Sequence, residues 1–157
     1  MKPVPKNWTR FSSAVNYTDA NKAIDWLCEA FGFEVRLKVE GDGGILVHSE
    51  LVFGDGLLMV GDTRSMGHKG WSHQQSPAQI GGVNTQSIQV YVDDVLAHCE
   101  RARKAGATIT MEPKVSDYGE EFWADRSYEC RDHEGHTWWF TERLRSSETT
   151  PPSHVKH

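Results

Sequence analysis

His48 and Glu50 are the residues whose types and spacing best suit acid-base chemistry. They stand two positions apart in an apolar segment, 45–53, that has the character of a strand, so both side chains point to one face. An imidazole beside a carboxylate can bind a cationic or hydrogen-bonding ligand, or serve as base and orienting partner if burial brings a pKa near neutrality. The same pair can also be an ion pair or a contact between two copies of the chain, and the spacing leaves these alternatives open.

Aromatic residues could build the wall of a binding site. Alternation along a strand sends the neighbours Trp138 and Trp139 to opposite faces, one toward a core and one toward a cleft. An aromatic wall suits a flat or cationic ligand, although aromatic residues equally often fill a core. The side chains expected to contribute are Met59, Tyr91, Trp123, Tyr128 and Trp139.

Three other kinds of site find no support in the sequence. No glycine-rich loop leads from a strand into a helix N-terminus that could hold phosphate. His133 and His136 flank a turn, and neither they nor the other histidines show metal-ligand spacing. No recognisable Ser-His-Asp or Cys-His nucleophile set is present.

The elements that must position these residues form a unit that occurs twice. Segment 87–94 alternates apolar and polar side chains, Asp94 can cap a helix over 95–105, and Gly106 can end it in the left-handed conformation. Segment 12–19 repeats this plan, with Asp19 as the cap of a helix over 20–31. The repeat suggests a duplicated module, although any two strand-helix units share some of these features.

Three further strands complete the first unit. Phe33, Val35, Leu37 and Val39 alternate with charged residues, which predicts a strand over 33–40 with these four side chains on the buried face. Segments 45–53 and 57–61 then form a hairpin across Gly54-Asp55. The predicted register pairs Phe53 with Gly56, Leu51 with Leu58 and Glu50 with Met59, which leaves His48, Glu50 and Met59 on the face away from the helix.

The second unit follows the same order and sets the domain boundaries. We predict a strand over 108–113 that ends at Pro113, a turn at 117–120, and a strand over 122–131 paired with 136–142. Residues 63–86 lack periodicity and form either a linker or a functional lid, and we favour the linker. The expected organisation is an α+β fold of two β-α-β-β-β modules, with boundaries 11–62 and 87–143, a linker 63–86 and a disordered tail 144–157.

Composition excludes several classes of function. The 157 residues include 38% hydrophobic and 25% charged residues, as in soluble globular proteins. A formal charge of −5 without a basic stripe argues against nucleic acid, and the absence of a long apolar run argues against a membrane partner. Three scattered cysteines indicate neither a disulfide framework nor a zinc cluster. We expect a cytoplasmic protein.

Four short motifs, in this order and spacing, resemble the glyoxalase/bleomycin-resistance/dioxygenase superfamily, also called the vicinal oxygen chelate superfamily. The motifs are Cys28-Glu-Ala-Phe-Gly-Phe, Val90-Tyr-Val-Asp-Asp-Val, Ala105-Gly-Ala and Arg131-Asp-His-Glu-Gly-His-Thr-Trp, and the resemblance covers about 11–142. It implies two modules that curve their sheets into a cleft, commonly in a homodimer.

Many members of that superfamily hold a divalent metal with one side chain from the first and one from the last strand of each module. The matching positions here are Ser12, Met59, Ser87 and Trp139. A neutral hydroxyl is a poor ligand, a thioether is too soft for Mg, Mn, Ni or Fe, and an indole does not coordinate. We therefore expect no metal and no cofactor, and glyoxalase or extradiol dioxygenase activity is disfavoured.

The leading prediction is a protein that binds a small organic molecule in a metal-independent cleft, in the manner of the antibiotic-sequestering members. The alternative is a lyase or isomerase of the same fold that uses His48 and Glu50 for acid-base chemistry, or an unrecognised metal site, and a third is a cleft filled by the protein's own side chains. The residues expected to line the cleft are Ser12, Met59, Ser87, Gln89, Tyr91, Trp123, Tyr128 and Trp139, with His48 and Glu50 beside them.

Overall fold

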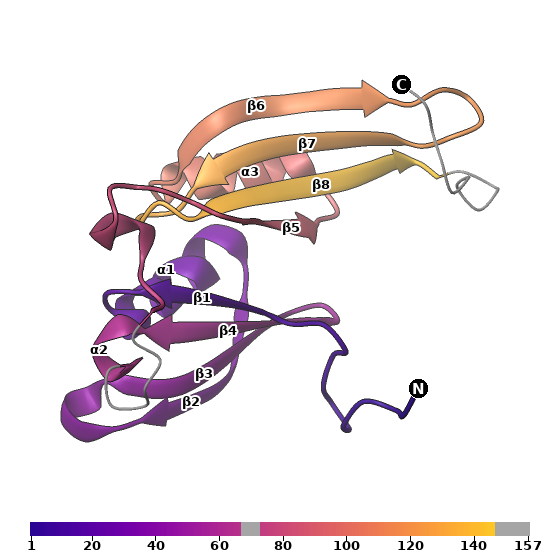
Figure 1. Cartoon of the computed structure of the whole chain (residues 1–157). Helices are drawn as coiled ribbons and strands as arrows, with labels where there is room; N and C mark the ends of the chain where they lie inside the picture. The colour runs from indigo at the N-terminus through magenta and orange to yellow at the C-terminus, as the bar shows by residue number, and fades with distance from the viewer. Residues whose placement is uncertain (67–72, 147–157) are drawn as a thin grey trace.

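The computed structural model describes residues 1–66 and 73–146 and shows an α+β fold of two β-α-β-β-β modules (Figure 1). The first contains β1 (Ser13–Tyr17), α1 (Ala20–Phe31), β2 (Glu34–Glu40), β3 (Leu46–Phe53) and β4 (Gly56–Asp62), with a short 3-10 turn η1 (Asp42–Gly44). The second contains β5 (Ser87–Tyr91), α3 (Val95–Lys104), β6 (Thr108–Asp117), β7 (Ala124–Arg131) and β8 (Thr137–Arg145).

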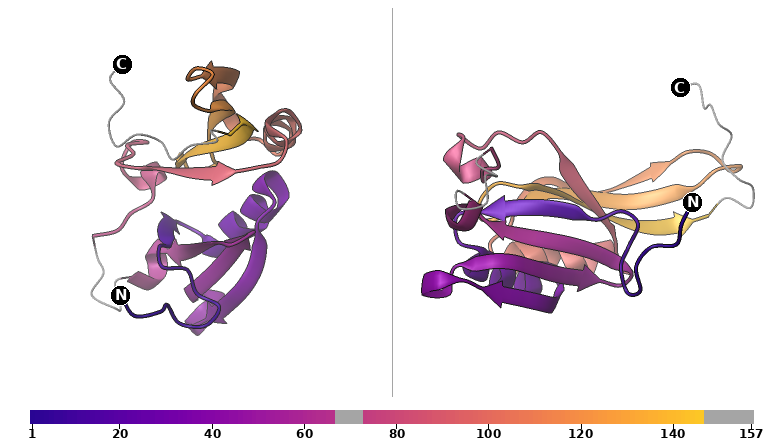
Figure 2. Two further views of the ribbon diagram at one scale, coloured as in Figure 1. Left: turned by 90° about the vertical axis from the view of Figure 1, so that its right-hand side faces the viewer. Right: turned by 60° about the horizontal axis from the view of Figure 1, so that its bottom comes forward.

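Each module folds its strands into one four-stranded sheet. The strand orders are β1-β4-β3-β2 and β5-β8-β7-β6, so the first strand of each module lies at one edge and pairs in parallel with the last. The sheets lie edge to edge with β1 beside β5, and α1 and α3 cover the same side of both (Figures 1 and 2). The opposite, uncovered side is called the open face below.

The first helix has the predicted bounds, and the second begins as predicted at Val95 and ends one residue early, at Lys104. The Asp19 carboxylate accepts a hydrogen bond from the N–H of Lys22, and Asp94 accepts one from Ala97, so each caps a helix N-terminus. Gly32 ends α1 with a φ of 82°, in the left-handed region that glycine adopts most easily. These local signals specify where each helix begins and ends.

The β3–β4 hairpin has the predicted register, with Phe53 opposite Gly56, Leu51 opposite Leu58 and Glu50 opposite Met59. Leu51 and Leu58 are buried under α1. Glu50 and Met59 consequently lie on the open face, because side chains alternate along a strand.

The prediction that the apolar residues of 33–40 are buried is wrong. Val35, Leu37 and Val39 are exposed, and β2 is the outer strand of its sheet. A register shift between Val35 and Leu37 places Leu37 and Val39 opposite Glu50 and His48, so both lie on the open face. Phe33, just before the strand, is the one member of the predicted set that is buried.

The prediction that the strand beginning at Thr108 ends at Pro113 is also wrong. β6 continues to Asp117, and its pairing with β7 shifts between Met111 and Lys114. Proline lacks an N–H group, but an irregular position on an outer strand accommodates it without loss of the ladder beyond.

A core between the modules fixes their arrangement. Phe31 at the end of α1 packs against Trp138 and Phe140 of β8, with ring centroids 5.1 and 4.7 Å apart. The buried Asp132 carboxylate accepts hydrogen bonds from the Tyr17 hydroxyl (2.6 Å) and the Trp138 indole N–H (3.0 Å). A buried charge is tolerated when its oxygens are satisfied in this way.

The described parts of the predicted linker contain a one-turn helix α2 (Thr63–Met66) and a 3-10 turn η3 (Pro77–Gln79). The Glu134 carboxylate accepts hydrogen bonds from the Ser76 hydroxyl and the Thr18 N–H, so 73–86 is tied to both modules. The predicted tail lies outside the described residues apart from its first three positions. No helix in the described ranges is long and apolar enough to cross a membrane.

Candidate functional site

The facing edges of β1 and β5 border a cavity that we call the seam cavity. Its volume is about 460 Å³, within the range of small-molecule sites. Its buried lining is apolar and includes Phe33, Leu57 and Leu58, whereas Ser87 and Gln89 offer exposed hydroxyl and amide groups. The lining residues are Phe11, Ser12, Ser13, Phe33, Phe53, Asp55, Gly56, Leu57, Leu58, Ser87, Ile88, Gln89, Val90 and Tyr91.

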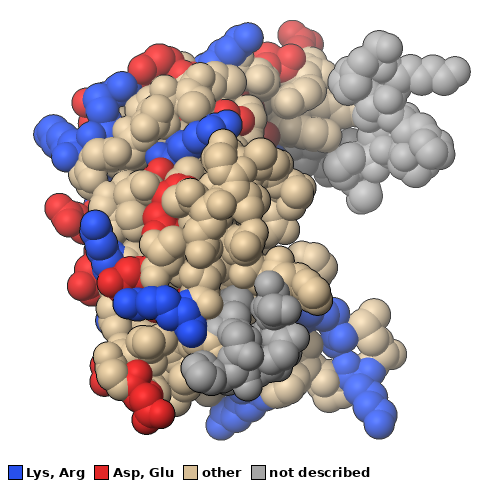
Figure 3. Space-filling model, turned by 60° about the vertical axis from the view of Figure 1, so that its left-hand side comes forward, with Lys and Arg blue, Asp and Glu red and all other residues tan. Residues whose placement is uncertain are grey.

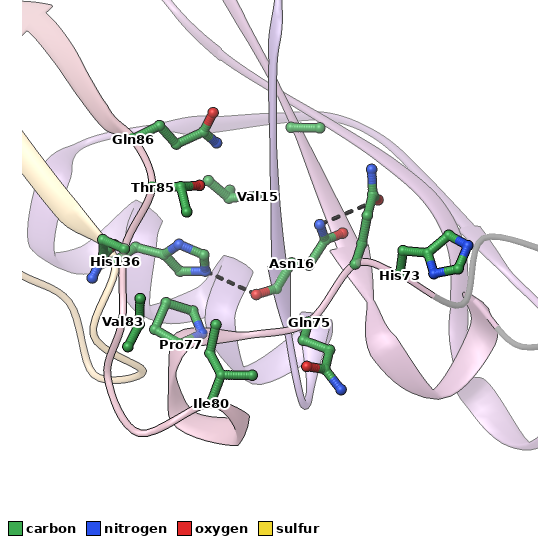
Figure 4. Close-up of a pocket in the computed structure, with 13 residues that line it drawn as sticks. Val15, Asn16, His73, Gln75, Pro77, Ile80, Val83, Thr85, Gln86 and His136 are labelled. Atoms are coloured by element: carbon green, nitrogen blue, oxygen red, sulfur yellow. Dashed lines mark hydrogen bonds between the residues drawn. The ribbon is translucent and has the colours of Figure 1, made fainter.

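A second hollow of about 420 Å³, which we call the linker cavity, adjoins the first along both strands. Ser13 and Ser87 line the seam cavity, while their neighbours Ala14 and Gln86 line the linker cavity. Figure 4 shows the His136 imidazole donating to the Asn16 carbonyl (2.8 Å) at its centre. The two cavities are therefore successive parts of one groove between the modules.

Four of the predicted ligand-binding residues meet in the seam cavity: Ser12, Ser87, Gln89 and Tyr91. Met59 and Trp139 lie on the open face of β4 and β8, the strands next to β1 and β5. Met59 is paired there with Ala14, and Trp139 with Gln89. Alternation correctly predicted that the two neighbouring tryptophans separate, and the one buried in the core is Trp138.

Tyr128 was expected on the aromatic wall, but the structure places it on the helix side of the sheet, fully buried. Its hydroxyl lies 2.7 Å from His98 Nδ1, and burial raises its pKa above the ordinary value. The side chain alternates with Ser127 and Glu129, which take the open face. Tyr128 therefore does not reach the seam cavity.

Trp123 lies at the far end of the second sheet with Tyr91 and Arg143. The Arg143 guanidinium lies over both rings, 5.6 Å from the Tyr91 centroid and 5.7 Å from that of Trp123. It also donates to the Tyr91 hydroxyl (2.9 Å) and pairs with Asp125. This network fixes the orientation of Tyr91, which is 52% exposed at the cavity rim.

His48 and Glu50 are in contact, with Nε2 and Oε1 2.9 Å apart. The Glu50 side chain is only 7% exposed, and its second oxygen pairs with Arg36 Nε at 3.2 Å. Arg36 in turn lies beneath the Trp8 ring and donates to the Asn7 carbonyl. The pair thus lies on the open face of the first sheet, covered by the N-terminal segment, and lines neither cavity of the seam.

The four positions that the resemblance matches to metal ligands do not fit a divalent metal. Serine, methionine, serine and tryptophan supply no carboxylate or imidazole at Ser12, Met59, Ser87 and Trp139. Over 1–66 and 73–146, no group of three or more His, Cys, Asp and Glu side chains is arranged to hold a metal ion.

Sequence reasoning missed part of the groove. Phe11, which is 91% exposed, and Asp55 line the seam cavity, and five carboxamides line the linker cavity. The high glutamine content of the predicted linker was the one signal in the sequence that could have indicated these carboxamides. Which of the linker residues fold back against β1, however, depends on contacts between residues far apart in the sequence. The carboxamides are Asn16, Gln74, Gln75, Asn84 and Gln86.

Paired modules with a groove at their shared edge define an α+β protein of the glyoxalase/bleomycin-resistance fold. The model of the Glyoxalase/Bleomycin resistance protein/Dioxygenase superfamily matches residues 10–140, and the chain belongs to this superfamily. None of the curated proteins compared with the chain matches it significantly.

Solved structures agree with this assignment. TioX from Micromonospora sp. ML1 is 30% identical over 90% of this chain and 100% of its own, with a TM-score of 0.62. A family enzyme from Burkholderia phytofirmans PsJN (16% identity, 85% and 98% coverage, TM-score 0.63) shares the fold. So does a superfamily member from Sphaerobacter thermophilus DSM 20745 (16%, 86% and 98%, 0.62).

Proposed function

We propose that this protein binds a small organic molecule in the seam cavity without a resident metal. The observation that carries the proposal is that Ser12, Ser87, Gln89 and Tyr91 converge on one cavity whose inner wall is apolar. An apolar wall supplies the binding free energy, and a few polar groups fix the orientation of the ligand. Such a site needs no bond-making group.

The size of the cavity sets the expected affinity. A ligand of roughly 25 non-hydrogen atoms at about −0.3 kcal/mol per atom gains about −7.5 kcal/mol, which corresponds to a dissociation constant in the micromolar range. Binding at this level is measurable by calorimetry and by fluorescence.

The test uses two probes, the fluorescent aromatic 8-anilinonaphthalene-1-sulfonate and metal-free bleomycin. We expect at least one to bind saturably to the native protein. Ser87→Trp fills the cavity and should weaken binding about tenfold or more. The matched control is Leu96→Trp, which adds the same ring on the exposed side of α3, away from both cavities, and should bind as the parent does. Saturable binding that Ser87→Trp leaves unchanged would place the ligand elsewhere.

The second candidate function is acid-base catalysis by His48 and Glu50, as in a lyase or isomerase acting on an oxygenated substrate. The buried Glu50 carboxylate holds His48 at 2.9 Å, an arrangement that can orient an imidazole base. Both Glu50 oxygens already have partners, however, and the pair lies outside the seam cavity. Turnover that Glu50→Gln abolishes while the ligand still binds would favour this candidate.

A further inference from the structure

The edge of β5 that faces the seam carries main-chain groups without a partner in the described part of the chain. The Val92 N–H donates to the Thr141 carbonyl (2.9 Å) beside β8. Successive residues of a strand direct their N–H and C=O groups to opposite edges, so Ser87, Gln89 and Tyr91 direct theirs to the seam. Among the described strands β5 pairs only with β8, and no described residue bonds across the seam to these groups.

The seam cavity follows this edge. All five residues of β5, from Ser87 to Tyr91, line it, whereas a cavity on one face of the sheet would touch every second residue. The main chain of β5 is therefore accessible from the cavity. A row of free N–H and C=O groups is the usual template for adding another strand.

The facing strand β1 is also open toward the seam. The Asn16 carbonyl accepts from His136 and the Thr18 N–H donates to Glu134, so even-numbered residues of β1 point toward the second module. Ala14 shares this direction and lines the linker cavity. No partner for its main chain lies across the seam among the described residues.

The linker cavity offers neutral hydrogen-bonding groups. Carboxamides both donate and accept, and Gln75 and Gln86 form no hydrogen bond within the described residues (Figure 4). Among the residues that the structure describes, no Lys, Arg, Asp or Glu side chain lines this cavity, and Asp55 is the single one in the seam cavity. In the space-filling view, charged side chains gather mainly at the left, and the surface toward the hollow at the right is mostly uncharged (Figure 3).

From these observations we infer that the ligand is an extended, uncharged molecule with an amide backbone, a short peptide or peptide-like compound, that adds as a strand to the seam edge of β5. The inference rests on the proposed function and names the ligand class for the same site. Main-chain bonds to Ser87, Gln89 and Tyr91 would hold it. Alternate side groups would enter the apolar wall at Phe33, Phe53 and Leu57, and one end would reach the carboxamides. Five residues of strand span roughly 17 Å, which a ligand of about five residues matches.

The decisive probe is an acetylated, amidated pentapeptide of alternating phenylalanine and alanine, compared with a copy whose alternate amides are N-methylated. Methylation removes donors that a strand would use and leaves the side groups in place. We expect saturable binding of the parent peptide and about tenfold or greater loss of affinity for the methylated copy, since that copy lacks the N–H donors of the main-chain hydrogen bonds.

A pair of variants tests the same bonds from the protein side. Gln89→Pro removes the N–H that faces the seam, whereas Gln89→Ala keeps it and removes only the side chain. We expect the proline variant to bind about tenfold more weakly than the alanine variant, because both lack the carboxamide and only the proline variant also lacks the N–H. Far-ultraviolet circular dichroism and a thermal melt check that both fold, and the peptide comparison applies to the unmodified protein in any case.

The outcomes separate this inference from the proposed function. Equal binding of both peptides would overturn main-chain pairing while leaving a small-molecule site. Binding of 8-anilinonaphthalene-1-sulfonate in the seam cavity without binding of either peptide would overturn the ligand class alone. Failure of the peptides, 8-anilinonaphthalene-1-sulfonate and bleomycin together would overturn both.

Discussion

At the scale of single residues, the open face of the first sheet is organised by Glu50. One carboxylate oxygen faces His48 and the other faces Arg36, whose guanidinium lies under Trp8. A charge with so little exposure is stable only because both oxygens are occupied. The same arrangement therefore joins the N-terminal segment to β3, whatever further role His48 has.

Replacing this carboxylate should cost stability. Glu50→Gln keeps the size of the side chain but removes the negative charge, and we expect the free energy of unfolding to fall by about 1–2 kcal/mol, because Arg36 is one-third exposed and keeps some hydration. Urea unfolding measures the difference. Glu34→Gln, on the exposed part of β2, is the matched control and should change stability by no more than about 0.5 kcal/mol. Equal losses in the two variants would contradict this role for Glu50.

At the scale of elements, the two helices depend on aspartate caps that the sequence shows directly. Asp94 accepts from the Ala97 N–H at 2.9 Å, whereas its neighbour Asp93 is exposed and caps nothing. The two residues have the same side chain in adjacent positions. Substitutions at the two positions therefore separate the effect of the capping hydrogen bond from the effect of the negative charge.

We expect Asp94→Ala to lower the free energy of unfolding by about 1 kcal/mol and the melting temperature by about 2–4 °C. Asp93→Ala removes an equal charge without a cap and should leave the melt nearly unchanged. Differential scanning calorimetry of the two variants and the parent is sufficient. A drop of the same size in both would mean that charge near the helix N-terminus, and not the hydrogen bond, is responsible.

The elements that were predicted correctly are those specified by nearby residues. Caps, glycine stops and the two-residue turn at Gly54-Asp55 act within a few positions, so the helices and the β3–β4 register follow from the sequence. The burial of β2 and the end of β6 depend on a register shift and on strand order, which pairs of distant segments decide.

The candidate site likewise has features that a local sequence pattern predicts and features that depend on distant contacts. Alternation placed Ser87, Gln89 and Tyr91 on one face, and the structure brings them to one cavity. It did not predict that Tyr128 lies on the helix side, because the strand had to be placed in phase with its partner first. The groove itself forms only when β1 and β5 meet, and no local pattern encodes that contact.

At the scale of the whole molecule, the outer strand β2 presents an apolar edge. Leu37 and Val39 are 41% and 40% exposed, and within the described part of the chain β2 pairs only with β3. Exposed apolar outer strands favour association. We propose that a second copy of the chain covers this edge in the expected homodimer.

Sedimentation velocity over a hundredfold range of concentration tests this proposal. We expect a dimer for the parent and a shift toward monomer for Leu37→Lys, because a charge in the interface would lose hydration without a partner. Val115→Lys is the matched control, since Val115 is similarly exposed on β6, the outer strand of the other sheet. A monomeric parent at every concentration would refute the proposal.

The contact between the modules should make stability depend on pH through His98. This residue of α3 lies between the Tyr128 hydroxyl (Nδ1, 2.7 Å) and the Phe31 carbonyl of α1 (Nε2, 3.0 Å). Burial lowers its pKa, the Phe31 carbonyl opposes that shift, and Arg101 adds to it. The folded protein thus prefers the neutral imidazole, which donates from Nε2 and accepts at Nδ1.

The sign of the dependence follows from proton uptake. Below about pH 6.5, the pKa of His98 in the unfolded chain, the unfolded chain binds a proton that the folded chain does not bind. Stability is therefore full above that pH and falls as the pH drops toward the lower pKa of His98 in the folded chain. His133, whose pKa burial also lowers, contributes in the same direction. We expect urea unfolding at pH 7.5, 6.5 and 5.5 to show this loss, and His98→Gln to reduce its slope. His73→Gln, an exposed control, should retain the parent slope. If His98→Gln left the slope of stability against pH unchanged, the module contact would not lower the affinity of His98 for a proton.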